Sequence, residues 1–300
     1  MIQAMTMKPG KCSEKRALVR RRKTAVITGA SSGMGRCMAR LLSEKIACLE
    51  EIWIVARRAE RLDALSAELK KCGSRKFAER RIRIFSGDIC EEQMQSALRK
   101  ALALEQPELL FLVNAAGFGK IGSVSELSEE TQAKMIALNC EATVHLCWMC
   151  LPYMAEKRGR IINFGSAAAF LPQPQFAVYA ATKAFVLSFS EALREELRGK
   201  KIGVTAVCPG PVRTEFFEIA EELHTAALYK KLLMADAGQV CRKALSDSLK
   251  RKPVSVSGIS MNAFAVLTRL LPHRFFFFCI RQINRSGGKT GDAEIKNFGA

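Results

Sequence analysis

Apolar and polar residues follow two rhythms along this chain, and the two rhythms alternate. Short runs rich in β-branched or aromatic residues predict strands at 24–29, 51–56, 81–86, 109–113, 160–165 and 201–207, with 254–257 as one more. Between them, apolar residues at helical spacing predict helices at 34–47, 61–72, 91–105, 128–156 and 176–198. Strands that alternate with helices build a parallel sheet covered on both faces. We therefore predict an α/β fold with a doubly wound parallel sheet.

The same pattern divides the chain into three parts. Residues 1–22 form a basic N-terminal segment that we predict to be flexible, and residues 23–257 form one domain without an internal repeat or a low-complexity linker. Residues 258–300 predict a C-terminal amphipathic helical extension and a polar tail. No apolar run approaches the roughly 18 residues that span a membrane, and the N-terminus has no apolar core of a secretory signal. We expect a cytoplasmic protein.

Composition narrows the classes of site. Hydrophobic residues make up 49% of the chain and charged residues 25%, as in ordinary globular proteins. The 11 cysteines have no paired spacing, apart from Cys147 and Cys150 in a helical pattern, and the three histidines lie far apart. This arrangement predicts no metal site, and it suits thiols that serve as small apolar side chains in a reducing compartment.

The net charge of +18 is concentrated partly at the two ends of the chain. Such basic flanks can bind nucleic acid or anionic lipid, or they can be solvated segments without a specific partner. No zinc finger, RNA-binding motif or basic recognition helix accompanies them. We therefore favour solvated flanks and predict no specific nucleic-acid partner.

The first predicted strand leads directly into GASSGMG (29–35), which has glycines at 29, 33 and 35. Glycines at this spacing let the backbone turn tightly and approach a pyrophosphate at the N-terminus of the next helix. A glycine turn is informative when it follows a strand and opens a helix, as it does here. The sequence predicts a dinucleotide site at this turn.

The end of the second predicted strand indicates which dinucleotide binds. An Asp or Glu about 20 residues beyond the glycine turn would hydrogen-bond the ribose 2′-hydroxyl of NAD. This chain has Ala56, Arg57 and Arg58 at that place. Two guanidinium groups can bind a 2′-phosphate, and the alternative is a pair of exposed arginines. We predict NADP(H) as the cofactor.

The sequence YAATK (179–183) opens the predicted helix 176–198. Tyr179 and Lys183 are four residues apart and therefore share one helical face. An ammonium about 4 Å from a phenol favours the phenolate by roughly 4 kcal/mol at an effective dielectric of about 20, before desolvation opposes it. A phenol whose pKa moves toward neutrality is a general acid or base. The alternative is a half-buried Tyr beside a surface Lys without a shared task.

These patterns occur together with others in the order of a known family. The motifs are TGASSGMG (28–35), GD (87–88), NAAG (114–117), Asn139, Ser166, Tyr179-x-x-x-Lys183 and PGPVRT (209–214). With them the chain resembles the short-chain dehydrogenase/reductases over about residues 23–257. The resemblance implies a Rossmann-type fold and an NADP-preferring carbonyl reductase that interconverts C=O and CH–OH groups.

The resemblance also implies roles for single residues. Tyr179 would exchange a proton with the substrate oxygen, and Lys183 would lower its pKa and bind the nicotinamide ribose. Ser166 would orient the carbonyl, and Asn139 would hold a water behind Lys183. Besides Tyr179 and Lys183, the implied cofactor contacts are Gly29, Ser31, Ser32, Gly33, Met34, Gly35, Arg57, Arg58, Asp88, Ile89, Asn114, Ala115, Gly117, Pro209, Gly210, Val212 and Thr214.

Substrate choice is predicted to lie in the segment after PGPVRT, which in this family forms a mobile flap. Its apolar residues, Phe216, Phe217, Leu223, Leu228, Tyr229, Leu232 and Leu233, suit a bulky lipophilic substrate such as a steroid, a 3-oxoacyl compound or a xenobiotic ketone. The Phe-rich tail (259–285) could cover the pocket, pack on a second subunit or lie at a membrane surface, in that order of preference. We expect a homodimer or homotetramer.

A function from another class is a non-catalytic protein that senses NADP(H) and binds a partner or nucleic acid through its basic ends. Such a protein has no need for Ser166, Tyr179 and Lys183 together. The intact set therefore favours an enzyme.

Overall fold

The computed structural model describes residues 20–71, 80–215 and 234–278. Their centre is a seven-stranded sheet in the order β3-β2-β1-β4-β5-β6-β7. Every neighbouring pair is parallel, which confirms the predicted doubly wound sheet. The strands are β1 (Lys23–Thr28), β2 (Glu51–Ala56), β3 (Arg81–Ser86), β4 (Glu108–Asn114), β5 (Arg160–Phe164), β6 (Gly203–Val207) and β7 (Val254–Ser255).

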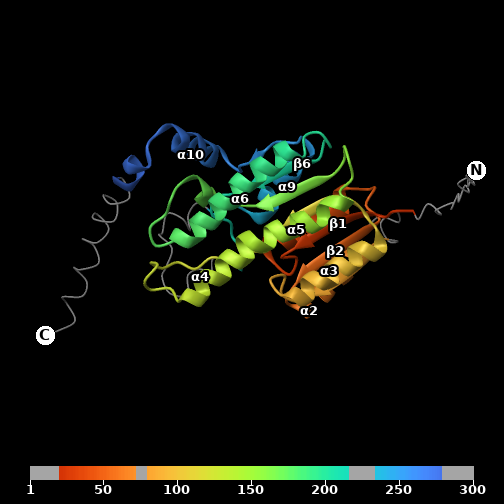
Figure 1. Ribbon diagram of the computed structural model, residues 1–300. Helices are drawn as coiled ribbons and strands as arrows, with labels where there is room; N and C mark the ends of the chain where they lie inside the picture. Colours follow the sequence, from red (N-terminus) through yellow and green to blue (C-terminus); the bar gives the residue numbers. More distant parts are fainter. Residues whose placement is uncertain (1–19, 72–79, 216–233, 279–300) are drawn as a thin grey trace, which may run out of the picture.

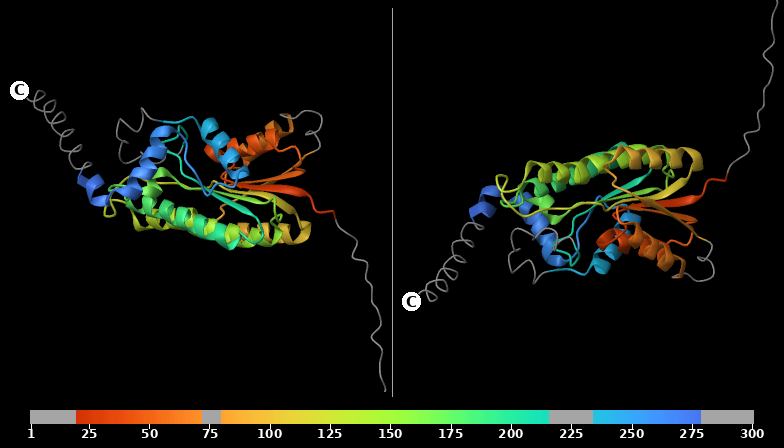
Figure 2. Two further views of the ribbon diagram at one scale, coloured as in Figure 1. Left: turned by 90° about the horizontal axis from the view of Figure 1, so that it is seen from above. Right: turned by 90° about the horizontal axis from the view of Figure 1, so that it is seen from below.

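Helices cover both faces of this sheet (Figures 1 and 2). Alternate residues of the central strands face opposite layers, as the strand period requires: Ile27 and Ile54 join one core, and Val26 and Trp53 join the other. The first layer holds α1 (Gly33–Lys45), α2 (Ala59–Lys71) and α9 (Ala237–Leu249). The second holds α3 (Glu92–Glu105), α4 (Glu129–Ile136), α5 (Ala142–Cys150) and α6 (Ala177–Glu196).

The chain reverses its direction of travel across the sheet between β1 and β4. It moves outward from β1 through β2 to β3, and then returns to place β4 on the other side of β1. Crevices at such a switch point, outside the carboxyl ends of the strands, are where open α/β sheets bind ligands. The topology therefore directs attention to the loops after β1, β2, β3 and β4.

The long helix predicted at 128–156 is interrupted in the structure. It runs as α4, a π-helical turn η2 (Ala137–Glu141), α5 and a 3₁₀ turn η3 (Leu151–Tyr153). By length and composition, Glu129–Tyr153 could cross a membrane, but half of its apolar window is buried inside the fold. The apolarity of this helix is thus accounted for largely by its packing on the sheet.

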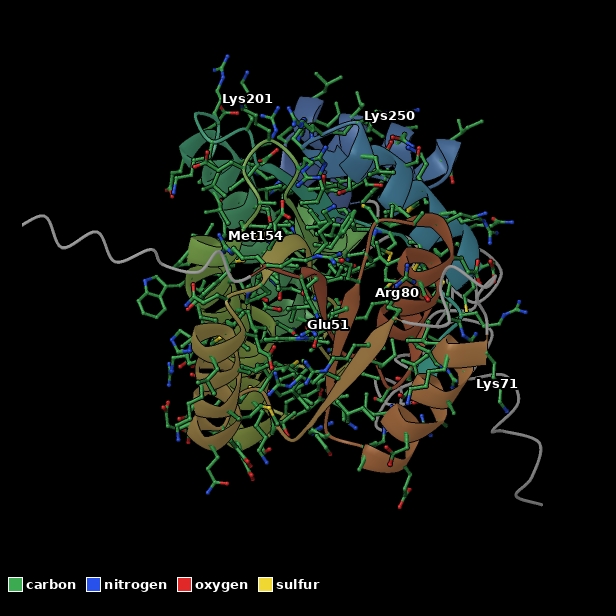
Figure 3. All side chains as sticks on the ribbon, turned by 90° about the vertical axis from the view of Figure 1, so that its right-hand side faces the viewer. Glu51, Lys71, Arg80, Met154, Lys201 and Lys250 are labelled. Atoms are coloured by element: carbon green, nitrogen blue, oxygen red, sulfur yellow. The ribbon has the colours of Figure 1, made fainter. Side chains whose placement is uncertain are left out.

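Arginine side chains form hydrogen bonds at the opposite edge of the sheet, where the strands begin. Arg80 is buried and donates to the carbonyl of Ser43 (2.6 Å) in the last turn of α1 and to those of Ile46 (3.1 Å) and Leu49 (2.9 Å) after it, and Figure 3 shows it beside this edge. Arg21 donates to the Gln106 carbonyl (2.8 Å). Arg21 thus connects the start of β1 with the turn after α3. The flexible segment at 1–22 stays a prediction, and residues 1–19 lie outside the described ranges.

At the other end of the chain, α10 (Ile259–Leu270) and a further helical stretch at 273–278 form the predicted C-terminal extension. α10 lies at the upper left of the molecule, away from β1 and β2 (Figure 1). Its Met261 and Ala265 pack in a small cluster with Phe170 and Cys208. The extension therefore stands beside the loops that follow β5 and β6.

Candidate active site

The glycine turn after β1 has a backbone that a side chain would disrupt. Gly29 has φ +65°, and a Cβ built there would lie 2.7 Å from the carbonyl oxygen of Ala115. This close approach joins the loop after β1 to the loop after β4. Gly35 lies directly beneath the carbonyl of Gly29. The backbone of the turn is thus free to meet a bulky ligand on its outer side, as a pyrophosphate site requires.

A cleft of about 240 Å³ opens at this turn, at the switch point of the sheet. It brings together twelve of the predicted cofactor contacts: Gly29, Ser31, Ser32, Gly33, Met34, Arg57, Arg58, Asp88, Ile89, Ala115, Gly117 and Thr214. Residues that the sequence motifs did not single out also line it, among them Val55, Phe118, Leu138 and Glu215. A glycine-lined cleft with a basic end fits a phosphorylated dinucleotide.

Arg58 forms the basic end of the cleft. Its guanidinium donates to Ser31 Oγ (3.1 Å) and Ser32 Oγ (2.9 Å), so it is tied to the glycine turn. Arg57 is 73% exposed at its side chain and pairs with Asp88 across 3.8 Å. The two arginines therefore differ: Arg58 is part of the wall, whereas Arg57 projects into solvent at the rim.

The π-helical turn η2 places Asn139 in the site. Its amide donates to the Phe118 carbonyl (2.9 Å) and to Thr182 Oγ1 (3.0 Å), and its Oδ1 accepts from the Phe118 amide (3.1 Å). The residue is 1% exposed. π-bulges concentrate at functional sites because they re-aim a side chain. Here the bulge lets one amide link α6 to the loop after β4.

Lys183 reaches the same place from α6. Its Nζ donates to the Phe164 carbonyl (2.9 Å), and a Cβ on Gly117 would lie 3.3 Å from that Nζ. Gly117 itself lines the cleft, so the ammonium stands directly behind the cleft wall. Burial lowers the pKa of Lys183 to about 8, because a low-dielectric surrounding disfavours the charged amine.

Tyr179 and Ser166 complete the cluster. Tyr179 is 6% exposed, and its ring stacks on Phe176 with centroids 4.2 Å apart. Ser166 begins the 3₁₀ turn η4 (Ala167–Phe170), where its Oγ accepts from the Ala168 amide (3.1 Å), and it is hydrogen-bonded to the Tyr179 side chain. The predicted serine–tyrosine–lysine set is therefore in one place.

The expected electrostatic effect of Lys183 on Tyr179 is corrected by the structure. Burial raises the pKa of Tyr179 above its usual 10, and the hydrogen bond with Ser166 opposes this only partly. Lys183 Nζ lies 5.6 Å from the centre of the Tyr179 ring and is turned to the Phe164 carbonyl. Desolvation therefore outweighs charge attraction. A phenol in this state keeps its proton at neutral pH.

Some predicted contacts lie beside the cleft instead of in its wall. Asn114 is buried and donates to Asn163 Oδ1 (2.8 Å), which ties β4 to β5. Pro209 accepts from the Ala167 amide (2.7 Å), and Val212 is buried. Gly210 approaches Met261 of α10. The apolar residues predicted to choose the substrate fall within 216–233, outside the described residues.

Within the described part of the chain, no group of three or more His, Cys, Asp or Glu side chains could hold a metal ion. Cys147 and Cys150 are buried thiols on α5. Burial raises the pKa of Cys147 to about 12. These two residues belong to the core between α5 and the sheet.

Known proteins are similar to this chain in sequence and in fold. A family model described as short chain dehydrogenase matches residues 23–223. The chain belongs to the short-chain dehydrogenase family. An uncharacterized oxidoreductase of Staphylococcus epidermidis is 31% identical over 197 residues, which cover 65% of this chain and 80% of that protein. Serine 3-dehydrogenase of Agrobacterium fabrum is 33% identical over 201 residues, 64% of this chain and 73% of that enzyme.

Solved structures of this family have the same fold. A short-chain dehydrogenase from Sphingobium yanoikuyae in complex with NADPH superposes with a TM-score of 0.69 at 26% identity, over 93% of this chain and 98% of that one.

A further relative by sequence is 11-beta-hydroxysteroid dehydrogenase A of Sesamum indicum. It is 30% identical over 194 residues, but this covers only 53% of that enzyme and 64% of this chain. The present short-chain dehydrogenase is thus an oxidoreductase that acts on alcohol or carbonyl groups.

Proposed function

We propose that this short-chain dehydrogenase is an NADP-dependent carbonyl reductase or alcohol dehydrogenase with Tyr179 as its proton donor and acceptor. The observation that carries the proposal is the position of Gly117. This residue lines the dinucleotide cleft and also lies against both Asn139 and Lys183. One residue thus joins the cleft to the serine–tyrosine–lysine cluster, as hydride and proton transfer to a single carbonyl would require.

The cofactor would supply the hydride, and the side chains of the protein would transfer the proton and hold the substrate and the cofactor. Tyr179 would protonate the alkoxide in reduction, or take the proton in oxidation, with Ser166 hydrogen-bonding the same oxygen. A raised pKa favours the protonated phenol of the reductive direction. Lys183 would bind the nicotinamide ribose. Asn139 would hold a water behind Lys183 through its fixed amide.

Two features support NADP(H) over NAD(H). The end of β2 carries no carboxylate that could bind a 2′-hydroxyl, since Ala56, Arg57 and Arg58 stand there. Arg58 is held by Ser31 and Ser32 at the glycine turn, where a 2′-phosphate would lie. The Sphingobium relative was solved with NADPH, which is consistent with this choice.

A bulky apolar substrate is supported by the surroundings of Tyr179. Phe118, Phe176 and Leu127 belong to its hydrophobic cluster, and Phe170 and Met261 lie in the adjoining one. Such walls favour a lipophilic ketone or alcohol. The steroid dehydrogenase relative agrees with this proposal, whereas the serine dehydrogenase relative indicates that a polar substrate must be included in any screen.

A homodimer or homotetramer is supported by exposed aromatic residues on two neighbouring helices. Trp148 on α5 is 69% exposed, and Phe185 on α6 is 43% exposed. The main role of the C-terminal tail would be to cover the substrate site, and contact with a membrane surface would be a secondary role.

A non-catalytic NADP(H) sensor is not favoured, because Tyr179, Ser166 and Lys183 lie together in the structure.

Cofactor preference tests the proposal. Replacing Arg57 and Arg58 together by Gln should weaken NADPH binding about 100-fold and leave NADH within about threefold, because charge-assisted hydrogen bonds contribute roughly 1.5–3 kcal/mol each. Dissociation constants from calorimetry provide the measurement, with Arg99→Gln on α3 as the control for lost charge. Equal affinity of the unmodified enzyme for NADPH and NADH would contradict the proposal.

A further inference from the structure

A carboxylate occupies the basic end of the cleft. Glu215 Oε2 accepts from Arg58 Nη1 at 3.0 Å, and Glu215 Oε1 pairs with Arg61 on α2. Arg58 and Glu215 both line the cleft. The hydrogen bond from Arg61, together with Arg58, lowers the pKa of the Glu215 carboxyl, so it is an anion at neutral pH. Two guanidinium groups therefore hold one anion that the protein itself provides.

The backbone fixes Glu215 in this place. Residues 211–213 pair with Ala235, through Ala235 N to the Pro211 carbonyl (2.8 Å) and Arg213 N to the Ala235 carbonyl (3.1 Å). A Cβ on Gly33 would lie 3.4 Å from Thr214 Cγ2, so the residue before Glu215 touches the glycine turn. The chain after β6 is thus laid across the turn with its carboxylate toward the arginines.

Arg61 extends the basic end by one helical turn. The Leu62 amide donates to the Arg58 carbonyl (3.2 Å), so Arg58 stands at the start of α2 and Arg61 follows three residues later on the same side. Arg61 Nη1 contacts Glu215 and its side chain is 43% exposed. No sequence motif marks Arg61, because only the folded chain brings it beside Glu215.

We propose that Glu215 is an internal competitor for the phosphate-binding arginines, so that Arg58, Arg61 and Glu215 together set the preference between NADPH and NADH. The inference rests on the proposed use of NADP(H). A 2′-phosphate and the Glu215 carboxylate carry charge of the same sign, and both need the Arg58 guanidinium. Binding of the phosphorylated cofactor must therefore displace the carboxylate, while binding of NADH need not.

The size of the effect follows from the exposure of the partners. The side chains are 42%, 43% and 35% exposed for Arg58, Arg61 and Glu215, so solvent screens both ion pairs. Screened pairs contribute roughly 0.2–1 kcal/mol each. Loss of the competing charge should then strengthen NADPH binding about threefold to tenfold.

The test compares Glu215→Gln with the unmodified enzyme. Dissociation constants for NADPH, NADH, adenosine 2′,5′-bisphosphate and 5′-AMP are measured by calorimetry at one salt concentration. The expected result is about threefold to tenfold tighter binding of NADPH and of the bisphosphate, with NADH and 5′-AMP unchanged. Glu60→Gln, an exposed residue beside Arg61 in the sequence, removes the same charge without an ion pair to Arg58 and should change none of the four constants.

The outcomes separate this inference from the proposed function. One outcome is that the unmodified enzyme prefers NADPH and that Glu215→Gln has the same preference for NADPH or a weaker one. In that case Glu215 does not compete with the 2′-phosphate, while the NADP assignment stands. If all four ligands weaken together, Glu215 only supports the fold. If the unmodified enzyme binds NADH as well as NADPH and the Gln variant does too, the NADP assignment itself fails. Adding Arg61→Gln to Glu215→Gln should remove part of the gain for the bisphosphate, and no loss there would exclude Arg61.

Discussion

Lys183 shows at the scale of a residue how function opposes stability. Its ammonium is 5% exposed, and the folded protein holds its pKa at about 8 against 10.5 in an open chain. The unfolded chain therefore binds a proton more tightly between pH 8 and pH 10.5, and the free energy of unfolding should rise with pH across that window. The full difference corresponds to about 3 kcal/mol.

This prediction is checked by denaturant unfolding between pH 7 and pH 10. The free energy of unfolding of Lys183→Met should not rise with pH in this range. The difference in stability between the wild type and the variant should therefore grow as pH increases. Tyr179 is present in both proteins, and its raised pKa acts in the opposite direction only near and above pH 10. Lys45→Met at the exposed end of α1 should keep the wild-type slope. Parallel pH profiles of the wild type and Lys183→Met would contradict the buried charge.

Tyr179 marks what sequence spacing could and could not predict about a residue. The spacing correctly placed Tyr179 and Lys183 in one cluster. It did not give the sign of the pKa shift of Tyr179, because burial depends on Phe176 and on the loops that surround the ring. Proximity is a local property of a helix, while desolvation belongs to the whole fold.

At the scale of elements, the turn between β1 and α1 is the part most exposed to single substitutions. Gly29→Ala would place a methyl group 2.7 Å from the Ala115 carbonyl at a positive φ. We expect a loss of stability of more than about 1 kcal/mol and a loss of dinucleotide binding of at least about tenfold. Thermal unfolding and calorimetry measure the two effects.

Gly199 offers the matched control for that substitution. A Cβ there meets nothing within 4 Å, in the turn that follows α6. Gly199→Ala should leave binding unchanged and keep stability within about 0.5 kcal/mol. Tight dinucleotide binding by Gly29→Ala would mean that the turn tolerates a side chain and does not cradle the ligand.

Most elements with a strong local pattern were predicted, and those decided by context were not. All seven strands were found near their predicted bounds. Five of them carry a buried apolar run, whereas β3 was predicted from its alternating pattern and β7 is only two residues long. α9 was not predicted, although Asp236 caps it and Val240, Cys241, Ala244 and Leu245 face the core. These apolar residues recur at helical spacing, so the signal for α9 was present in the sequence and was missed. The π-turn at Asn139 has no sequence pattern of its own.

At the scale of the whole molecule, the C-terminal extension packs on the loops that follow β5 and β6 and has an uncovered outer surface. Met261 approaches Gly210, and Phe276 is buried against Phe264. On the outer side, Ile259 is 92% and Leu270 74% exposed. Within its described residues, the predicted apolar tail thus packs on the fold through Met261 and Ala265, which lie next to Cys208 and Phe170.

Met261 should therefore affect the substrate and not the cofactor. Met261→Ala should lower kcat/KM for a bulky ketone about fivefold to thirtyfold, because lost apolar contact in a pocket is worth roughly 1–2 kcal/mol, with the NADPH dissociation constant unchanged. Steady-state kinetics on a small and a bulky ketone provide the measurement. Leu270→Ala, on the outer side of the same helix, should leave both constants unchanged. Equal loss on small and bulky ketones would show that α10 does not shape the pocket.

The sequence predicted most residues of the cleft, but it did not predict the ion pair that joins distant parts of the chain there. The motifs named most residues of the cleft because each reflects a local backbone need. Glu215 and Arg61 were not predicted, since their ion pair joins the chain after β6 to α2 across 154 positions. Long-range pairing of two common charged residues leaves no local signature, and only the fold reveals it.

The measurement that tests the central proposal most directly is turnover of Tyr179→Phe beside its NADPH affinity. Substrates of the wild type are first found by NADPH consumption with apolar and polar ketones and by NADP+ reduction with alcohols, including serine. The variant should then lose about 10²–10⁴-fold in kcat while NADPH binds within about twofold of wild type, because the glycine turn and arginines are untouched. Tyr153→Phe, in η3, should keep full activity. Near-normal turnover of Tyr179→Phe with intact NADPH binding would contradict its role as the proton donor.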